Sequence, residues 1–273
     1  MNNQLAVLPE LDDFKKLSDH NINEFQEKGH TLIKQVLSPE EIAAYRPVIV
    51  DAADRYNTEK RKMADRDTYG KAFLQIMNLW QSDAEARKFV LAKRLAKIAA
   101  DLMGVENVRL YHDQALFKEP GGGPTPWHQD QYYWPIDTNN TITMWMPLVD
   151  IDVDMGMLTF ASGSFTEGSV FNFEISDESE TAYENYVDGK KFPISRANTM
   201  KAGDATWHRG FTMHHANGNK SHKMREVMTI IYMADGARVS PFKNNWQKND
   251  NEKWLMGKPI GELIDSELNP KLL

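Results

Sequence analysis

The chain has 273 residues, of which 41% are hydrophobic and 26% are charged, and its formal net charge is −7. This length exceeds that of an average domain but is normal for a β-barrel or β-sandwich with added helices. The acidic balance without a basic block argues against a nucleic-acid partner, and the absence of cysteine excludes disulfides, cysteine-ligated zinc, iron–sulfur clusters and a cysteine nucleophile.

The N-terminal part of the chain predicts helices with one early strand. Apolar spacing over residues 10–36 indicates a helix followed by a strand at 29–36. The Ser-Pro-Glu-Glu sequence at 38–41 is a helix start, and we expect this helix to end near Arg46 because Pro47 breaks it. Two further helices are predicted over residues 51–62 and 85–103.

Farther along the chain the pattern changes to strands separated by glycine and proline. The predicted strands are 108–117, 141–148, 157–160 and 226–233. Residues 177–190 are polar and indicate a surface insertion or a lid, and we expect the tail from Asn245 onward to pack back on the body. Helices followed by many short strands predict an α+β fold, mainly β, with a jelly-roll core of the cupin type and flanking N-terminal helices. A doubly wound nucleotide-binding fold is not expected, because the chain has no GxGxxG motif.

The segment Trp127-His128-Gln129-Asp130 carries the strongest chemical signal. Residues two apart on a strand point to the same face, so His128 and Asp130 would direct an imidazole and a carboxylate toward one point. A third ligand must come from a later strand, where His214 and His215 are adjacent and only one of them can face inward. Two imidazoles and one carboxylate can hold a redox iron and leave positions open for reaction. A lone His-x-Asp pair is also found as hydrogen-bonded core groups.

Arg225 begins the strand that follows the turn after His214, so strand pairing would bring it back beside the metal. Its planar guanidinium suits an acidic co-substrate, because it can pair with a carboxylate through two hydrogen bonds. An arginine that precedes a strand is otherwise a surface residue.

Several blocks of the chain have the order and spacing of a known family. They are residues 29–30, 38–41, 116–120, 127–130 with Tyr133, 145–150, 156–164, and 203–208 with His214, Asn219, Ser221 and Arg225. Together they resemble the phytanoyl-CoA dioxygenase family of Fe(II)/2-oxoglutarate-dependent oxygenases. The resemblance covers about residues 20–240, and we expect one oxygenase domain over 1–273 with a C-terminal extension at 241–273.

The resemblance implies that His128, Asp130 and His214 bind Fe(II) and carry the catalysis, because the family places Asn five and Arg eleven residues after the last metal histidine. Arg225 would then bind 2-oxoglutarate, and Gln114 and Trp145 fall where the family contacts this co-substrate. The implied activity is that of a dioxygenase that uses O2, converts 2-oxoglutarate to succinate and CO2, and hydroxylates or otherwise oxidises a small metabolite.

Other positions carry weaker expectations. His112 and Gln75 are candidates to line a substrate cavity, and Lys118 is expected to be a solvated loop lysine rather than a charge in the cavity. Phe165 replaces the histidine that often ends the family's Gly-Ser motif, but that position is not a metal ligand. Because Asp130 is present where related halogenases have a small residue, the resemblance favours hydroxylation or another oxidation over halogenation.

Two other classes of protein stay open from the residues alone. Zinc also accepts two histidines and a carboxylate, which would make the chain a hydrolase or isomerase, and a cupin-like binding module would use His128 and Asp130 only as core groups. The start of the chain lacks a basic segment followed by an apolar run, and no stretch approaches the roughly 18 apolar residues needed to span a bilayer. We therefore expect a cytoplasmic protein with no membrane partner. The sequence predicts neither the oligomeric state nor the substrate, including whether the substrate is a CoA ester.

Overall fold

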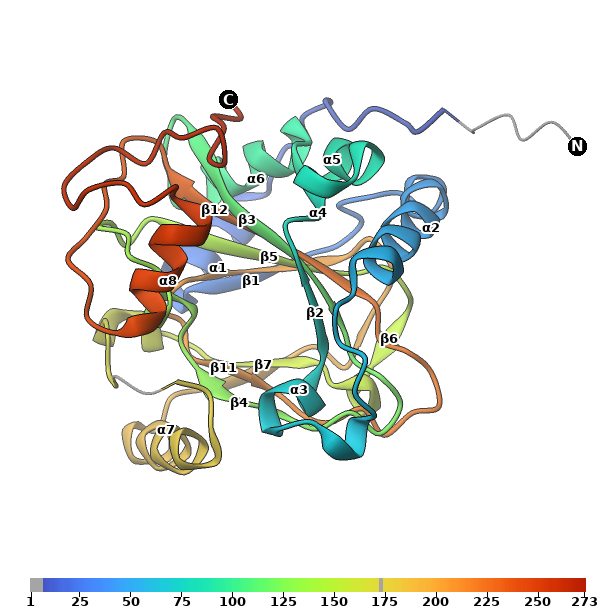
Figure 1. Ribbon diagram of the computed structural model, residues 1–273, viewed down its shortest axis with the longest axis vertical. Coiled ribbons are helices and arrows are strands. Elements are labelled where there is room, and N and C mark those ends of the chain that lie inside the picture. The colour runs from blue at the N-terminus through green and yellow to red at the C-terminus, as the bar shows by residue number, and fades with distance from the viewer. Residues whose placement is uncertain (1–6, 172–173) are drawn as a thin grey trace, which may run out of the picture.

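The computed structural model describes residues 7–171 and 174–273 (Figure 1). Its largest sheet has the strand order β1-β10-β5-β12-β3-β2, a second sheet has the order β4-β11-β7-β8, and β6 pairs with β9. The strands are β1 (His30–Ile33), β2 (Leu74–Met77), β3 (Val108–Phe117), β4 (Thr125–His128), β5 (Thr141–Pro147), β6 (Ile151–Asp152), β7 (Leu158–Ala161), β8 (Ile194–Arg196), β9 (Thr199–Met200), β10 (Ala205–Arg209), β11 (His214–Ala216) and β12 (Val227–Ala234). Every strand pair is antiparallel, so the expected jelly-roll core is confirmed.

Helices cover the outer face of the six-stranded sheet, as the upper part of Figure 1 shows. The helices are α1 (Asp19–Lys28), α2 (Pro39–Tyr56), α3 (Thr68–Ala72), α4 (Leu79–Ser82), α5 (Ala84–Val90), α6 (Lys93–Met103), α7 (Asp177–Lys190) and α8 (Asn245–Trp254). Of these, α1, α4 and α6 contact the six-stranded sheet, α2 and α5 pack on α4, and α7 packs against β4 of the smaller sheet. Among them α6 packs on β3, β5 and β12, and its apolar stripe of Leu95, Ile98 and Leu102 is fully buried. Burial of such a stripe is the main source of stability for a helix of this length.

Pro47 does not end its helix, and the expectation of a break there is wrong. The helix α2 runs from Pro39 to Tyr56 with Pro47 inside it. A proline in a helix interior costs about 3 kcal/mol, because it removes one hydrogen bond and crowds the preceding turn. The buried side chains on both sides of Pro47, Tyr45 and Ile49, offset this cost by packing into the core.

Other predicted helix and strand boundaries also differ from those in the structure. The helix expected over 51–62 ends at Tyr56, and the one expected over 85–103 divides into α5 and α6. The strand expected over 29–36 ends at Ile33, where the chain turns. Residues 177–190 form the helix α7, which packs against β4, and the tail packs back on the body through α8, as expected. No helix among the described residues is long and apolar enough to cross a membrane.

Candidate metal centre

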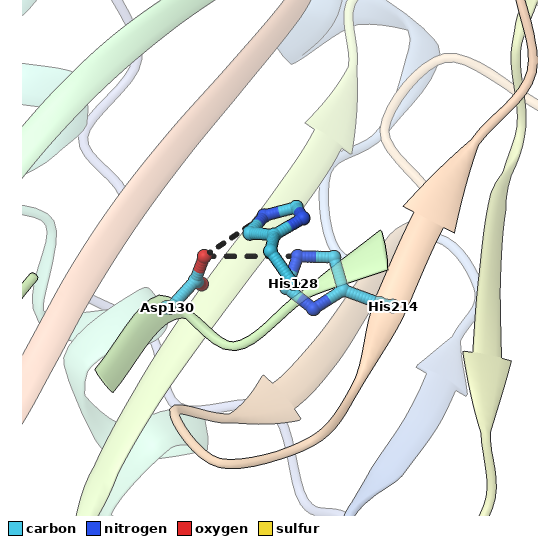
Figure 2. A group of neighbouring side chains, drawn as sticks. All are labelled: His128, Asp130 and His214. Atoms are coloured by element: carbon cyan, nitrogen blue, oxygen red, sulfur yellow. Dashed lines mark ion pairs between the residues drawn. The ribbon is translucent and has the colours of Figure 1, made fainter. Parts of the chain in front are cut away.

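Two short strands of the smaller sheet bring the candidate ligands together (Figure 2). His128 is the last residue of β4 and His214 the first of β11, and the two are direct cross-strand partners. Asp130 directs its Oδ1 at both rings, 3.4 Å from His128 Nε2 and 3.7 Å from His214 Nε2. One donor atom from each residue lies within 4.8 Å of the others, so a single metal ion can contact all three.

Asp130 reaches this point by a different route from the one expected. The strand ends at His128, and Asp130 opens a short 3₁₀ helix, η2 (Asp130–Tyr132). The argument from strand alternation was therefore wrong for Asp130, although the side chain still turns toward the two histidines. The turn itself supplies the geometry, because it brings the carboxylate back over the end of β4.

Each histidine has its outer nitrogen fixed by a backbone carbonyl. His128 Nδ1 lies 2.8 Å from the Pro126 carbonyl oxygen, and His214 Nδ1 lies 2.9 Å from that of Thr212. A carbonyl oxygen can only accept, so Nδ1 carries the proton in both rings and Nε2 keeps its lone pair toward Asp130. A second hydrogen bond of this kind is the usual way in which a protein orients a histidine that binds a metal.

The second oxygen of Asp130 is held by two groups that were not expected at the site. Thr143 Oγ1 donates to Asp130 Oδ2 over 2.8 Å, and His208 Nε2 lies 3.1 Å from the same oxygen. Thr143 and His208 are cross-strand partners in β5 and β10 of the other sheet. With Oδ2 occupied in this way, Oδ1 is the oxygen that remains for a metal.

The protonation states fit a metal site. Burial alone would raise the pKa of Asp130, but the neighbouring His214, His128 and His208 hold that pKa well below its ordinary value. Burial lowers the pKa of His214 well below its ordinary value, and the neighbouring His128 and His208 lower it further. The site therefore presents an ionised carboxylate beside a neutral imidazole, which are the forms that bind a divalent cation.

The structure separates the two adjacent histidines. His214 is 4% exposed and belongs to the candidate metal group, whereas His215 points the other way and contacts the Trp127 ring in a tilted arrangement with a centroid distance of 4.2 Å. Two imidazoles and one carboxylate on one side, with open space opposite, match the coordination preferred by non-haem iron(II).

A cavity of about 630 Å³ opens onto the three ligands and is lined by both sheets. Gln114 and Trp145 line it, as do His112 and Gln75. Gln75 Nε2 donates to Gln114 Oε1 over 2.8 Å, which joins β2 to β3 along the cavity wall. The structure thus brings every one of these sequence-predicted positions to the same cavity as the candidate metal ligands.

Arg225 lies at the cavity wall and keeps an unpaired hydrogen-bond donor. Its side chain is 2% exposed, Nη1 donates to the Gly156 carbonyl over 2.7 Å, and the guanidinium lies 5.3 Å from the Trp145 ring centroid. Within the described part of the chain, Arg225 Nε has no hydrogen-bond partner and no carboxylate pairs with the guanidinium. Burial lowers its pKa to about 9. A buried arginine with an unused donor is a binding place for an anion that enters from the cavity.

Lys118 is buried, and the expectation of a solvated loop lysine is wrong. It is 0% exposed, and its backbone pairs with that of Arg225 through two hydrogen bonds of 2.9 Å. Its Nζ donates to the Gly123 carbonyl and lies 3.4 Å from Thr125 Oγ1. Burial, and then the charge of Arg225, lower its pKa to about 6. The burial of Lys118 was not predicted because a glycine loop follows it in the sequence, and such loops usually lie on the surface.

Sequence reasoning also missed the outer wall of the cavity. Tyr69 of α3 and several residues of α8 line it. No pattern in the polar tail distinguishes a solvated helix from one that closes a cavity. The pairing of Thr143 with His208 could have been found, because both belong to strands that alternate toward the same interior.

Comparison with known proteins gives one family. The family model described as Phytanoyl-CoA dioxygenase (PhyH) matches residues 25–227. This range contains the three candidate ligands and Arg225, and it ends before α8.

Two curated proteins are similar in sequence. A probable alpha-ketoglutarate-dependent hypophosphite dioxygenase of Stutzerimonas stutzeri is 23% identical over 227 residues, which cover 78% of each chain. A phytanoyl-CoA dioxygenase of Arabidopsis thaliana is 27% identical over 170 residues, which cover 62% of this chain and 59% of that protein.

Solved structures share the fold over most of the chain. The non-heme alpha ketoglutarate dependent carbocyclase SnoK from nogalamycin biosynthesis has a TM-score of 0.76 and 25% identity, and the alignment covers 93% of this chain and 96% of that one. The epimerase SnoN, solved in complex with Fe3+, alpha ketoglutarate and nogalamycin RO, has a TM-score of 0.75 and 22% identity, with 93% and 98% covered. Both likenesses extend past residue 227, so they include more of the chain than the family match.

Proposed function

The chain belongs to the phytanoyl-CoA dioxygenase family, and from this premise we propose that His128, Asp130 and His214 hold its iron while Arg225 binds the far carboxylate of 2-oxoglutarate. The protein is an Fe(II)/2-oxoglutarate-dependent dioxygenase. When bound, the iron and co-substrate supply the oxidising chemistry: O2 and 2-oxoglutarate become succinate and CO2 as a small substrate is oxidised. The family match leaves the zinc hydrolase and the binding module without support.

The observation that carries the ligand assignment is the pair of free Nε2 atoms facing one Asp130 oxygen. Carbonyl oxygens fix the Nδ1 protons of His128 and His214, so both rings present a lone pair to the same point. Thr143 and His208 keep Asp130 from rotating away. These residues orient the metal-binding atoms before any metal is present, which lowers the cost of binding.

The co-substrate assignment rests on the unused donor of Arg225. An anion that reaches Arg225 Nε would satisfy a buried group that otherwise lacks a partner. Trp145 packs on the guanidinium and fixes its plane, and Gln114 supplies a polar group on the wall beside it. We propose that Gln114 and Trp145 contact 2-oxoglutarate for these reasons.

We also propose that residues 1–273 act as one oxygenase domain, because the strands of the matched region and α8 from residues 241–273 line the same cavity. The family is consistent with a small-molecule substrate, and a cavity of about 630 Å³ has the size of such a site. A cytoplasmic location stays a prediction.

The test is an anaerobic titration of the metal-free protein with Fe(II) and then 2-oxoglutarate, followed by the visible charge-transfer absorption of their chelate. We expect the absorption in the wild type and in His215→Ala, and its loss in His214→Ala. His215 packs against Trp127 and is not part of the candidate metal group, so its variant is the matched control. Equal loss in both variants, or absorption that survives in His214→Ala, would remove His214 from the ligand set.

A further inference from the structure

The C-terminal helix α8 presents one complete face to the cavity. Trp246, Asn249, Asp250, Lys253 and Trp254 all line it, at the spacing i, i+3, i+4, i+7 and i+8 that places side chains on one side of a helix. The helix lies outside the matched family residues 25–227. Its face therefore closes the cavity with residues that lie outside the region matched by the family model.

Asp250 is the carboxylate at the centre of this face, and the charge of Lys253, three residues farther along the helix, lowers its pKa. Tyr111 donates its hydroxyl to Asp250 Oδ2 over 2.8 Å, and Trp254 also hydrogen-bonds to it. None of the ion pairs found among the described residues includes Asp250. Burial raises its pKa to about 7, although the Tyr111 hydrogen bond opposes that shift. A carboxylate in this position gains most from a ligand that brings a positive charge.

Two aromatic side chains contact Asp250, and further rings line the same cavity. Trp254 is its neighbour on α8, and Tyr111, which binds it, packs edge-on against Trp134 at 5.6 Å. Tyr133 and Trp246 form a second edge-on pair at 5.9 Å. Trp134, Tyr133, Trp246 and Trp254 all line the cavity. Electron-rich ring faces beside a carboxylate are the usual environment in which proteins bind an ammonium group.

The other groups on this wall of the cavity also favour a positively charged ligand. His112 is 2% exposed, makes a ring contact with Trp254 at 5.8 Å, and has no hydrogen-bond partner for Nδ1 within the described chain. Burial lowers its pKa to about 3, so it is neutral and does not repel a cation. Glu174 and Asp67 add two carboxylates at the mouth, against the exposed Lys253.

We propose that the substrate carries a basic nitrogen, which binds as an ammonium at Asp250 against the ring of Trp254 while the carbon to be oxidised faces the metal site. This inference rests on the proposed function for the identity of the cavity. It adds the chemical class of the substrate: a small amine rather than a carboxylic acid or a phosphate-rich ester. Asp250 and Trp254 then set the orientation of the substrate through a group remote from the reacting carbon.

The experiment uses three probes of nearly equal size and different charge: 2-phenylethylamine, 2-phenylethanol and phenylacetate. Each is titrated calorimetrically into the full chain loaded anaerobically with Fe(II) and 2-oxoglutarate. We expect the amine to bind at least about tenfold more tightly than the alcohol, the effect of one partly buried charge pair with an aromatic neighbour. We expect phenylacetate to bind more weakly than the alcohol.

Asp250→Asn is the decisive variant, because asparagine keeps an oxygen that can accept from Tyr111 but removes the charge. It should abolish the preference for the amine and leave the affinity for the alcohol within about twofold of the wild type. Tyr111→Phe is the complementary control: it removes the Tyr111 hydrogen bond and retains the carboxylate, so the preference should persist. If Asp250→Asn keeps the preference, or if phenylacetate binds best in the wild type, the proposal is wrong.

The loaded complex also separates this proposal from the proposed function. Its visible absorption reports iron and 2-oxoglutarate binding, while the calorimetry reports the charge preference. Absorption without a preference for the amine overturns the substrate class and leaves the oxygenase site intact. If the absorption does not form, the proposed ligand set fails, and the same titration of the metal-free chain still decides between the three probes.

Discussion

The inner end of the cavity and its mouth are built in different ways. At the inner end four side chains come from strands whose partners are fixed by register: His128 faces His214, and Thr143 faces His208. At the mouth the lining side chains come from α8, from Tyr69 of α3 and from the irregular segment at Glu174. A shift of one residue in strand register would turn a ligand away from the site, whereas a helix at the rim can change its side chains without disturbing the sheets. The inner end is thus suited to one chemistry and the mouth to varied substrates.

Arg225→Met tests the inner end with the largest expected effect in this series. Truncating one partner of a buried charge pair costs about 2–5 kcal/mol, so the 2-oxoglutarate concentration needed for the chelate absorption should rise by at least about thirtyfold. Iron binding should not change, because Arg225 contacts none of the ligands. An unchanged co-substrate requirement would remove Arg225 from its role.

Thr143→Val tests whether the second oxygen of Asp130 needs its hydrogen bond. The variant keeps the shape of the side chain and removes the donor to Oδ2, and loss of such a supporting group typically weakens metal binding about 10–100-fold. The measurement is metal affinity by competition with a chelator. Thr159→Val is the matched control, since Thr159 is equally buried and its hydroxyl has no partner among the described residues. Equal effects of the two variants would mean that the hydroxyl of Thr143 does not position Asp130.

Lys118→Met tests the cost of the buried lysine at the inner end through the pH dependence of the free energy of unfolding. The pKa of Lys118 is about 6 in the folded chain against 10.5 when unfolded, so between these values the unfolded chain binds a proton that the folded chain lacks. The free energy of unfolding should therefore rise with pH in this window, by up to about 1.4 kcal/mol per pH unit from this group. Urea unfolding at pH 6.5, 7.5 and 8.5 should show the variant more stable than the wild type, with a gap that narrows as the pH rises. A gap independent of pH would show that Lys118 stays charged when buried.

Trp246→Phe at the mouth should have the smallest effect. The indole is 44% exposed and donates to Glu174 Oε2 over 2.7 Å, so losing this hydrogen bond should reduce the free energy of unfolding by less than about 1 kcal/mol. The chelate absorption should be unchanged. A weaker absorption would contradict the distinction between the two ends, because it would mean that the mouth contributes to the binding of iron and 2-oxoglutarate at the inner end.

The sequence predicted the inner end better than the mouth for a physical reason. The family resemblance identified His128, Asp130, His214 and Arg225 as one group from their order and spacing. Only the folded sheets bring these distant residues together in space. The burial of Lys118 depends on a cross-strand partner more than a hundred residues away, which a local pattern does not contain. The same holds for α8, whose polar sequence does not reveal which face is covered.

Local patterns predicted helices well where burial and capping agree. Ser38 accepts from Glu41 N in a capping box at the start of α2, as the Ser-Pro-Glu-Glu sequence indicated. Pro47 misled the prediction because tertiary packing of α2 outweighs a local rule. Asp130 lies outside the strand that was expected to hold it, so its approach to the histidines depends on a turn that residue spacing does not specify.

The lengths of the strands that carry the ligands have a consequence for amide hydrogen exchange. His214 lies on a strand of three residues and His128 on an edge strand of four, whereas β12 in the other sheet has eight residues and is paired with β3 and β5 along its length. Short strands open at a lower free energy than long central ones. In the metal-free protein we expect the amides of β4 and β11 to exchange with solvent well before those of β12. The local opening of this smaller sheet would then set how fast a bound metal leaves, independently of the global stability of the fold.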